Sequence, residues 1–145
     1  MQMKKIITIA AVAALTASSI ASAQSFEEAY NTARAQQGAN GTFEWNGKKY
    51  NTLREEEVLA AKPATQANAD ALIAAAKAKH KEARKAGFAW RDTTKRIKEA
   101  MALAKEGKFQ EAMDLAARAH YQARMGLVQR DYSEKHWIDA VPPLN

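Results

Sequence analysis

The sequence predicts a mainly α-helical protein, in which a helical hairpin within a small helical bundle follows a module of one helix and one β-hairpin. Three observations predict this fold. Apolar residues recur at helical spacing, capping boxes mark helix starts, and one Asn-Gly pair joins two short strand-like runs. The 145 residues and their ordinary composition suit a chain of this size and class.

The chain begins with the pattern of a secretory signal, predicted over residues 1–23. Lys4 and Lys5 give a positive start, an apolar stretch follows, and Ala-Ser-Ala forms a small-residue cleavage site. A membrane anchor is the alternative, but the apolar character fades after about ten residues of the stretch. We therefore expect a periplasmic protein that begins at Gln24 and does not stay inserted in the membrane.

Residues 24–62 are predicted to form the module of a helix and a β-hairpin. Its helix starts at a capping box, in which the Ser25 hydroxyl accepts a hydrogen bond from the amide of Glu28. A second capping box, from Thr52 to Glu55, predicts a short helix that stops at a Lys-Pro pair.

A β-hairpin is predicted over residues 42–51. Asn46-Gly47 is the dipeptide that best suits a type I′ turn, because both turn residues need positive φ. A two-residue turn pairs Phe43 with Tyr50 and places the aromatic side chains on one face. Since an isolated hairpin is marginally stable in water, we expect this face to pack on the preceding helix.

Residues 63–68 are predicted to be a linker, residues 69–138 a helical bundle, and residues 139–145 an irregular tail. Alanine-rich helical periodicity and glycine stops divide the bundle into three helices. They are expected over residues 69–86, from Asp92 or Thr93 to about Glu106, and from Gln110 to about Lys135.

Two apolar faces run along the last predicted helix when it is drawn at 100° per residue. The small face permits close helix packing and consists of Ala112, Ala116, Ala119, Ala123 and Gly126. The large face consists of Tyr121, Met125, Val128 and Tyr132. This face either packs within the chain or docks on a partner protein. Arg118 and Arg124 flank it and would suit carboxylates on an acidic partner.

The first predicted bundle helix, over residues 69–86, has many basic residues and only a narrow apolar stripe. The stripe consists of Leu72, Ile73, Ala76, His80 and Ala83. The basic residues are Lys77, Lys79, Lys81, Arg84 and Lys85. A solvated helix face is the simpler interpretation. The alternative is a structural or stress-related envelope protein that binds anionic membrane or wall surfaces. This fits the net charge, which is +6 for the whole sequence and +4 once Lys4 and Lys5 are removed with the signal.

The residue inventory argues against catalysis. The chain has no cysteine, so that it lacks a thiol nucleophile, a thiolate metal site and a c-type haem attachment motif. His80, His120 and His136 form no H-x-x-x-H or H-E-x-x-H pair, which argues against a preformed zinc site, and no Gly-rich phosphate loop is present. We expect a binding protein without cofactor, metal or nucleic-acid partner. An enzyme with an unrecognised site is the remaining option.

The segment from Gly107 to Ala116 looks like the turn and second helix of a tetratricopeptide unit, because it matches the pattern G-x-F-x-x-A. A solenoid of such units needs about three of them. One unit therefore indicates a single TPR-like helical hairpin.

A longer segment resembles the SoxXA-binding protein family over roughly residues 69–129. The resemblance rests on Gly-Phe-Ala-Trp-Arg-Asp-Thr from Gly87 and on Glu-Gly-Lys-Phe from Glu106. The family consists of small periplasmic helical proteins of the bacterial thiosulfate-oxidising (Sox) system. The resemblance implies an accessory protein that docks on the SoxXA c-type cytochrome and assists thiosulfate oxidation without chemistry of its own. The module before residue 62 departs from the family pattern.

Overall fold

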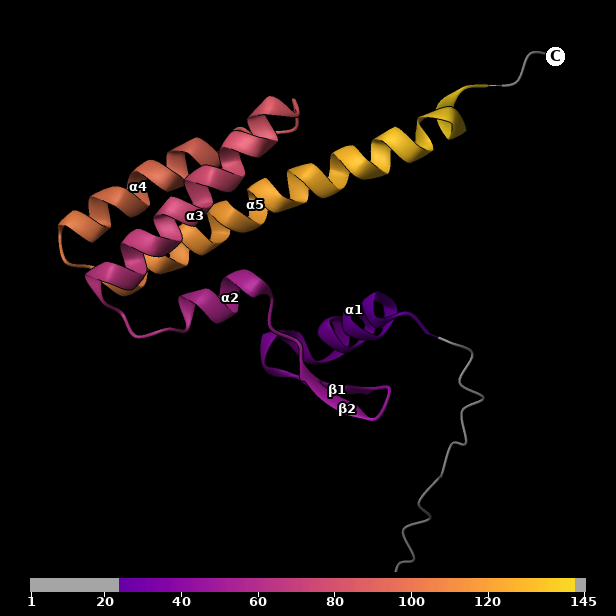
Figure 1. Cartoon of the computed structure of the whole chain (residues 1–145), viewed down its shortest axis with the longest axis horizontal. Coiled ribbons are helices and arrows are strands. Elements are labelled where there is room, and N and C mark those ends of the chain that lie inside the picture. Colours follow the sequence, from indigo (N-terminus) through magenta and orange to yellow (C-terminus); the bar gives the residue numbers. More distant parts are fainter. Residues whose placement is uncertain (1–23, 143–145) are drawn as a thin grey trace, which may run out of the picture.

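The computed structural model describes residues 24–142, which form a mainly α-helical fold as the sequence predicts (Figure 1). The predicted secretory signal lies outside the described residues, as do residues 143–145 of the predicted tail. The elements in chain order are α1 (Phe26–Gln37), the 3₁₀ turn η1 (Gly38–Asn40), β1 (Thr42–Trp45), β2 (Lys48–Asn51), α2 (Glu55–Ala60), α3 (Gln66–Lys85), α4 (Thr93–Lys105), α5 (Phe109–His136) and the 3₁₀ turn η2 (Trp137–Ala140).

The first capping box is confirmed at the start of α1. The Ser25 hydroxyl accepts a hydrogen bond from the Glu28 amide at 3.2 Å, and the Glu28 carboxylate accepts one from the Ser25 amide at 3.0 Å. These bonds satisfy two N–H groups that have no partner within the helix. The helix ends at Gly38, whose φ of 73° favours glycine.

The predicted β-hairpin and its register are confirmed, with Phe43 opposite Tyr50. Asn46 and Gly47 have φ angles of 49° and 72°, as a type I′ turn requires. The aromatic face packs on α1, because the Phe26 ring centroid lies 5.5 Å from that of Phe43 and 5.0 Å from that of Tyr50. The helix therefore supplies the apolar cover that a two-stranded sheet needs.

The second capping box, predicted at Thr52, is wrong. The residue before α2 is Arg54, whose amide donates to the Glu57 carboxylate at 2.8 Å. Thr52 is fully buried, and its hydroxyl donates to the Gly38 carbonyl at 2.6 Å and accepts from the Gly41 amide at 2.9 Å. The threonine hydroxyl therefore stabilises the loop after α1 and does not cap α2. A threonine hydroxyl can bond any backbone group that the fold brings within reach.

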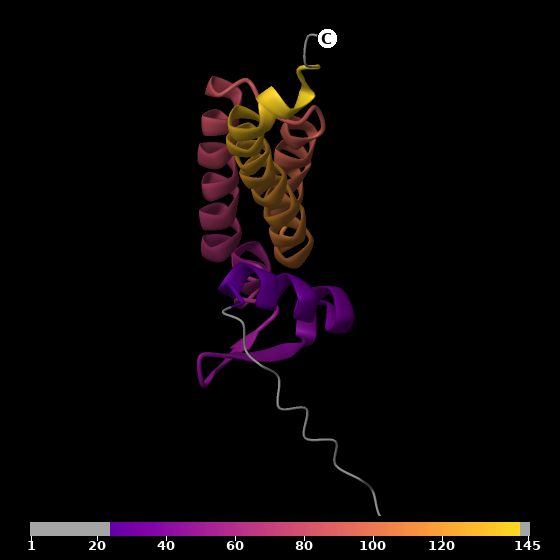
Figure 2. The same cartoon turned by 90° about the vertical axis from the view of Figure 1, so that its right-hand side faces the viewer.

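Helices α3, α4 and α5 run side by side, and α1 and the hairpin lie together at one side of them (Figure 2). α3 begins earlier than the sequence predicts. Thr65 is its cap, and the Thr65 hydroxyl accepts from the Asn68 amide at 3.2 Å. The segment predicted as a linker over residues 63–68 is therefore helical from Gln66 onward.

The bundle core consists largely of alanines that allow close helix packing. All five members of the predicted small face of α5 are buried. The predicted stripe of α3 is buried as well, and Met113 of α5 and Ile97 of α4 contribute large side chains to the core. The small face of α5 therefore lets this helix pack closely in the bundle, and the larger side chains fill the core between the three helices.

The C-terminal part of α5 projects beyond the other two bundle helices (Figure 1). With 28 residues α5 is about 42 Å long, whereas the 20 residues of α3 span about 30 Å. Gly126 is the last residue of the small face, and a Cβ atom there would lie 2.2 Å from the Phe88 carbonyl oxygen. The loop between α3 and α4 therefore crosses α5 at Gly126, and the helix continues past this crossing.

Candidate binding surfaces and an arginine cleft

A buried carboxylate joins α2 to α5. Glu56 is 2% exposed, and its Oε1 lies 3.1 Å from Nδ1 of His120 and 2.6 Å from Nε of Arg124. Nη2 of Arg124 donates to Oε2 of the same carboxylate at 3.1 Å. Burial alone raises the pKa of Glu56, but the hydrogen bonds from His120 and Arg124 outweigh it and hold the pKa at about 2. The carboxylate therefore stays ionised at neutral pH as a structural group.

A second ion pair joins α1 to α2. The guanidinium of Arg34 binds the Glu57 carboxylate through two hydrogen bonds of 2.6 Å, which lower the pKa of that carboxyl. Arg34 also donates to the Thr52 carbonyl at 2.7 Å, and the Tyr30 hydroxyl donates to the same oxygen at 3.2 Å. The N-terminal module is thus connected through α2 to α5 by charge-assisted hydrogen bonds.

The structure divides the large apolar face of α5 into two halves. Tyr121 and Met125 are half-buried and line a groove opposite Phe26 of α1. Val128 borders the end of the same groove but is exposed, and Tyr132 lies one turn further along the helix and is exposed as well. Packing within the chain therefore applies to Tyr121 and Met125, whereas docking of the exposed half on a partner stays a prediction.

The two arginines predicted beside that face have different surroundings. Arg124 is bound to Glu56, so its guanidinium already has a carboxylate partner within the chain. Its pKa is raised, chiefly by the hydrogen bond to Glu56. The sequence could not indicate this pair, because the two residues are 68 positions apart. Arg118 is exposed and lies in a cleft between α2, α4 and α5.

An exposed apolar surface covers the projecting end of the chain. We call it the C-terminal apolar surface; its members are Val128, Tyr132, Trp137, Ile138 and Val141, which are between 46% and 63% exposed. Helical periodicity predicts only Val128 and Tyr132 among them. Trp137, Ile138 and Val141 follow the last predicted helix in the sequence. Their close spacing is the signal that could have identified them. Isolated apolar residues are common at protein surfaces, whereas exposed apolar residues that gather at one end of a chain are a candidate for an interaction site.

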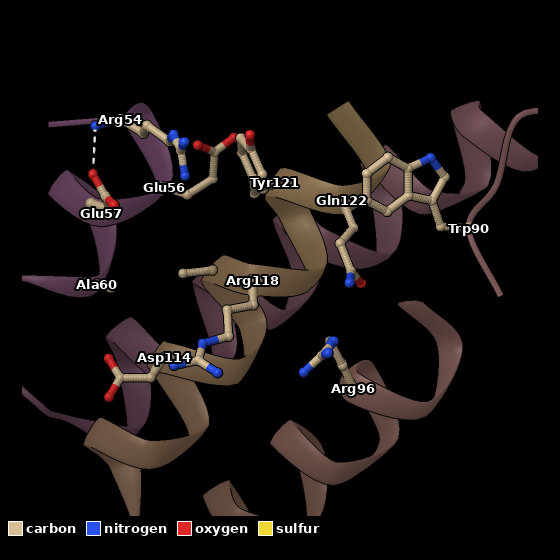
Figure 3. A pocket seen from close by; sticks show the side chains of 11 residues that line it. Arg54, Glu56, Glu57, Ala60, Trp90, Arg96, Asp114, Arg118, Tyr121 and Gln122 are labelled. Atoms are coloured by element: carbon tan, nitrogen blue, oxygen red, sulfur yellow. Dashed lines mark hydrogen bonds between the residues drawn. The ribbon is translucent and has the colours of Figure 1, made fainter. Parts of the chain in front are cut away.

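The cleft beside Arg118 has a volume of about 520 Å³ and is lined by arginines from three elements. We call it the arginine cleft. Arg54 comes from the start of α2, Arg96 from α4 and Arg118 from α5. Figure 3 shows the guanidinium groups of Arg96 and Arg118 in the same open space, with Tyr121 and Trp90 on one side of it. The arrangement provides positive charge and aromatic walls in one cavity.

A second basic region lies between α3 and α4. This basic groove has a volume of about 730 Å³, and an apolar floor includes Ile97 and Met101. Its cationic residues are Lys77, Lys81, Arg84, Lys85 and Lys98. His80 borders it, with Nε2 2.9 Å from the Thr94 hydroxyl and a pKa that is lowered by burial and by the nearby Arg84 charge. The predicted basic residues of α3 thus share one groove with a lysine of α4, except for Lys79, which pairs with Glu82.

Within residues 24–142, no group of three His, Asp or Glu side chains is placed to hold a metal ion. In the same range, no helix combines the length and the apolar character needed to cross a bilayer. No family model, curated protein or solved structure matches this chain.

Proposed function

We propose that this chain is a non-catalytic binding protein that docks on a partner protein through the C-terminal apolar surface. The observation that carries the proposal is the exposure of large apolar side chains at the projecting end of α5 and in the residues that follow it. Aromatic residues such as Tyr132 and Trp137 are enriched at the centres of protein interfaces. Exposure of these apolar side chains to water is unfavourable, and docking on a partner protein would bury them.

The spacing of the exposed residues supports a helix-in-groove mode of binding. Val128 and Tyr132 are four positions apart and lie on the same face of α5. The Tyr132 ring stacks on His136 one turn later, with centroids 4.1 Å apart. Anchors at such intervals are typical of helices that lie in an apolar groove of a partner.

We propose a c-type cytochrome of the Sox system, SoxXA, as the partner. The support is the resemblance of residues 69–129 to the SoxXA-binding protein family. In this proposal the chain assists thiosulfate oxidation by contact, and the cytochrome performs the chemistry. The absence of cysteine agrees with a role that needs neither a sulfur-carrying thiol nor a haem of its own.

Calorimetric titration of the purified chain against the SoxXA cytochrome tests this proposal. We expect saturable binding that Tyr132→Ala and Val128→Ala weaken, the former by about tenfold, because an interface aromatic is worth about 1.4 kcal/mol or more. Val58→Ala is the matched control, since Val58 is 46% exposed like Val128 but lies on α2. Equal affinity of the Tyr132 variant and the unmodified protein would contradict the proposal.

A second candidate function rests on the basic groove. Its five cations and apolar floor support binding to an anionic envelope surface, either membrane or wall. Cosedimentation with vesicles that contain anionic lipid distinguishes the two candidates. Binding through Lys81 and Arg84 should decline steeply above about 0.15 M salt, whereas binding through an apolar surface should persist. Salt-resistant binding, or no loss with Lys81→Gln, would exclude this candidate.

A further inference from the structure

We propose that the arginine cleft is a binding site for a polyvalent oxyanion, a phosphate or sulfate group that is free or carried by a small molecule. The cleft is separate from the C-terminal apolar surface, so the inference does not depend on the proposed docking function. Guanidinium groups form paired hydrogen bonds with such oxyanions, and they do so best where several converge on one cavity.

The charge balance of the cleft favours an anion. Arg54, Arg96 and Arg118 form no ion pair within 4.0 Å in the part of the chain that the structure describes. The two glutamates that border the cleft are already bound, Glu56 by His120 and Arg124 and Glu57 by Arg34. Asp114 at the rim accepts a hydrogen bond from Gln110 at 3.0 Å. That amide hydrogen bond leaves the charge of Asp114 in place, so the three arginines are set against one carboxylate without a cationic partner within 4.0 Å among the described residues, and the lining keeps an excess of positive charge.

Arg96 is the least satisfied of the three arginines. Its Nε is buried and has no hydrogen-bond acceptor among the described residues. An unsatisfied buried donor is unfavourable, and more so when the group is charged. The guanidinium groups of Arg96, on α4, and of Arg118, on α5, line the same cleft (Figure 3). An oxyanion between these helices would accept from the Nη groups of both guanidinium groups, and would so stabilise a charge whose Nε has no acceptor of its own among the described residues.

The size and walls of the cleft define the ligand class further. A volume of about 520 Å³ exceeds what a bare tetrahedral oxyanion fills, so that the body of a small ester also fits. Trp90 and Tyr121 provide ring surfaces, and Gln122 provides an amide whose oxygen already accepts from Thr93 at 3.2 Å. The guanidinium of Arg54 stacks 4.2 Å above the Tyr121 ring, which holds it beside the cavity.

Calorimetric titration with inorganic phosphate, sulfate and glucose 6-phosphate tests the inference at constant ionic strength set by chloride. We expect dissociation constants below about 1 mM for at least one of these probes. Tighter binding of glucose 6-phosphate than of phosphate would assign the ester as the preferred form, and equal binding would assign the free oxyanion. No heat with any probe up to about 10 mM would overturn the proposal.

Three variants locate the binding. Arg118→Gln should weaken it about tenfold, because one charge-assisted contact is lost from an exposed position whose replacement leaves the fold intact. Arg96→Gln should have a similar effect. Arg91→Gln removes the same charge from a side chain that is 95% exposed and outside the lining, and should leave affinity unchanged. Equal losses in all three variants would show unspecific charge attraction and overturn the proposal.

Nuclear magnetic resonance provides a readout that does not depend on heat. The Trp90 ring borders the cleft, and its indole N–H donates to the Gln129 side chain at 3.3 Å. The indole N–H of Trp45 donates to the Gln24 carbonyl in the N-terminal module, far from the cleft in sequence. Phosphate should shift the Trp90 signal and leave the Trp45 signal in place. A shift of both signals, or of neither at saturating phosphate, would contradict a site in the arginine cleft.

Discussion

Replacing Glu56 by glutamine should remove about 3 kcal/mol of stability at neutral pH. The variant keeps the shape of the side chain and removes the charge that His120 and Arg124 surround. The hydrogen bonds of the folded chain lower the carboxyl pKa from 4.5 to about 2, which corresponds to about 3 kcal/mol in favour of the folded state. Removal of one partner from a buried ion pair has effects of the same size.

The contribution of Glu56 to stability should also depend on pH in a definite direction. Because the pKa of Glu56 is lower in the folded state, its contribution is complete above about pH 4.5 and is lost as the pH falls toward 2. The difference between the unmodified protein and Glu56→Gln should therefore be about 3 kcal/mol at pH 7 and less than about 1 kcal/mol at pH 2.

Urea denaturation followed by circular dichroism, repeated from pH 7 to pH 2, measures both quantities. Glu55→Gln is the matched control, since it removes the same charge from an exposed neighbour on α2. That variant should differ from the unmodified protein by less than about 0.5 kcal/mol. A loss below about 1 kcal/mol for Glu56→Gln at pH 7, or a loss that does not change with pH, would refute the reasoning.

Three further substitutions test the way the parts are joined. Arg34→Gln should lower stability by about 1 to 2 kcal/mol in urea denaturation, because the Glu57 carboxylate loses its paired donor; an unchanged midpoint would contradict this. Gly126→Ala should lower the thermal midpoint although alanine favours helices, because its Cβ would lie 2.2 Å from the Phe88 carbonyl oxygen; a higher midpoint would show that the loop moves away freely. Gly47→Ala should cost about 1 kcal/mol, because φ is 72° there; hydrogen exchange should show faster opening of the hairpin, and unaltered exchange would argue against a strained turn.

Local patterns predicted most of the elements because their causes lie within a few residues. The Asn46-Gly47 turn fixes the hairpin register, and the capping box at Ser25 fixes the start of α1. The same kind of pattern failed at Thr52, where the hydroxyl bonds a loop that lies eleven or more positions earlier. A capping box forms only if the hydroxyl bonds the nearby helix amide. Here the Thr52 hydroxyl bonds backbone groups of a more distant loop instead.

The candidate sites depend on contacts between distant parts of the chain. The small and large faces of α5 follow from helical periodicity, so that the buried alanines were predictable from sequence. The partner of Arg124 was not, because Glu56 lies on a different helix. The arginine cleft combines residues of α2, α4 and α5, which no periodicity brings together. The arginine cleft could therefore be recognised only from the packed structure.

Hydrogen–deuterium exchange of the chain with and without the SoxXA cytochrome tests the central claim most directly. Docking through the C-terminal apolar surface predicts slower exchange in residues 128–141 when the cytochrome is saturating, with little change in the hairpin. Saturable binding without protection in residues 128–141, or protection confined to the basic groove between α3 and α4, would contradict the account.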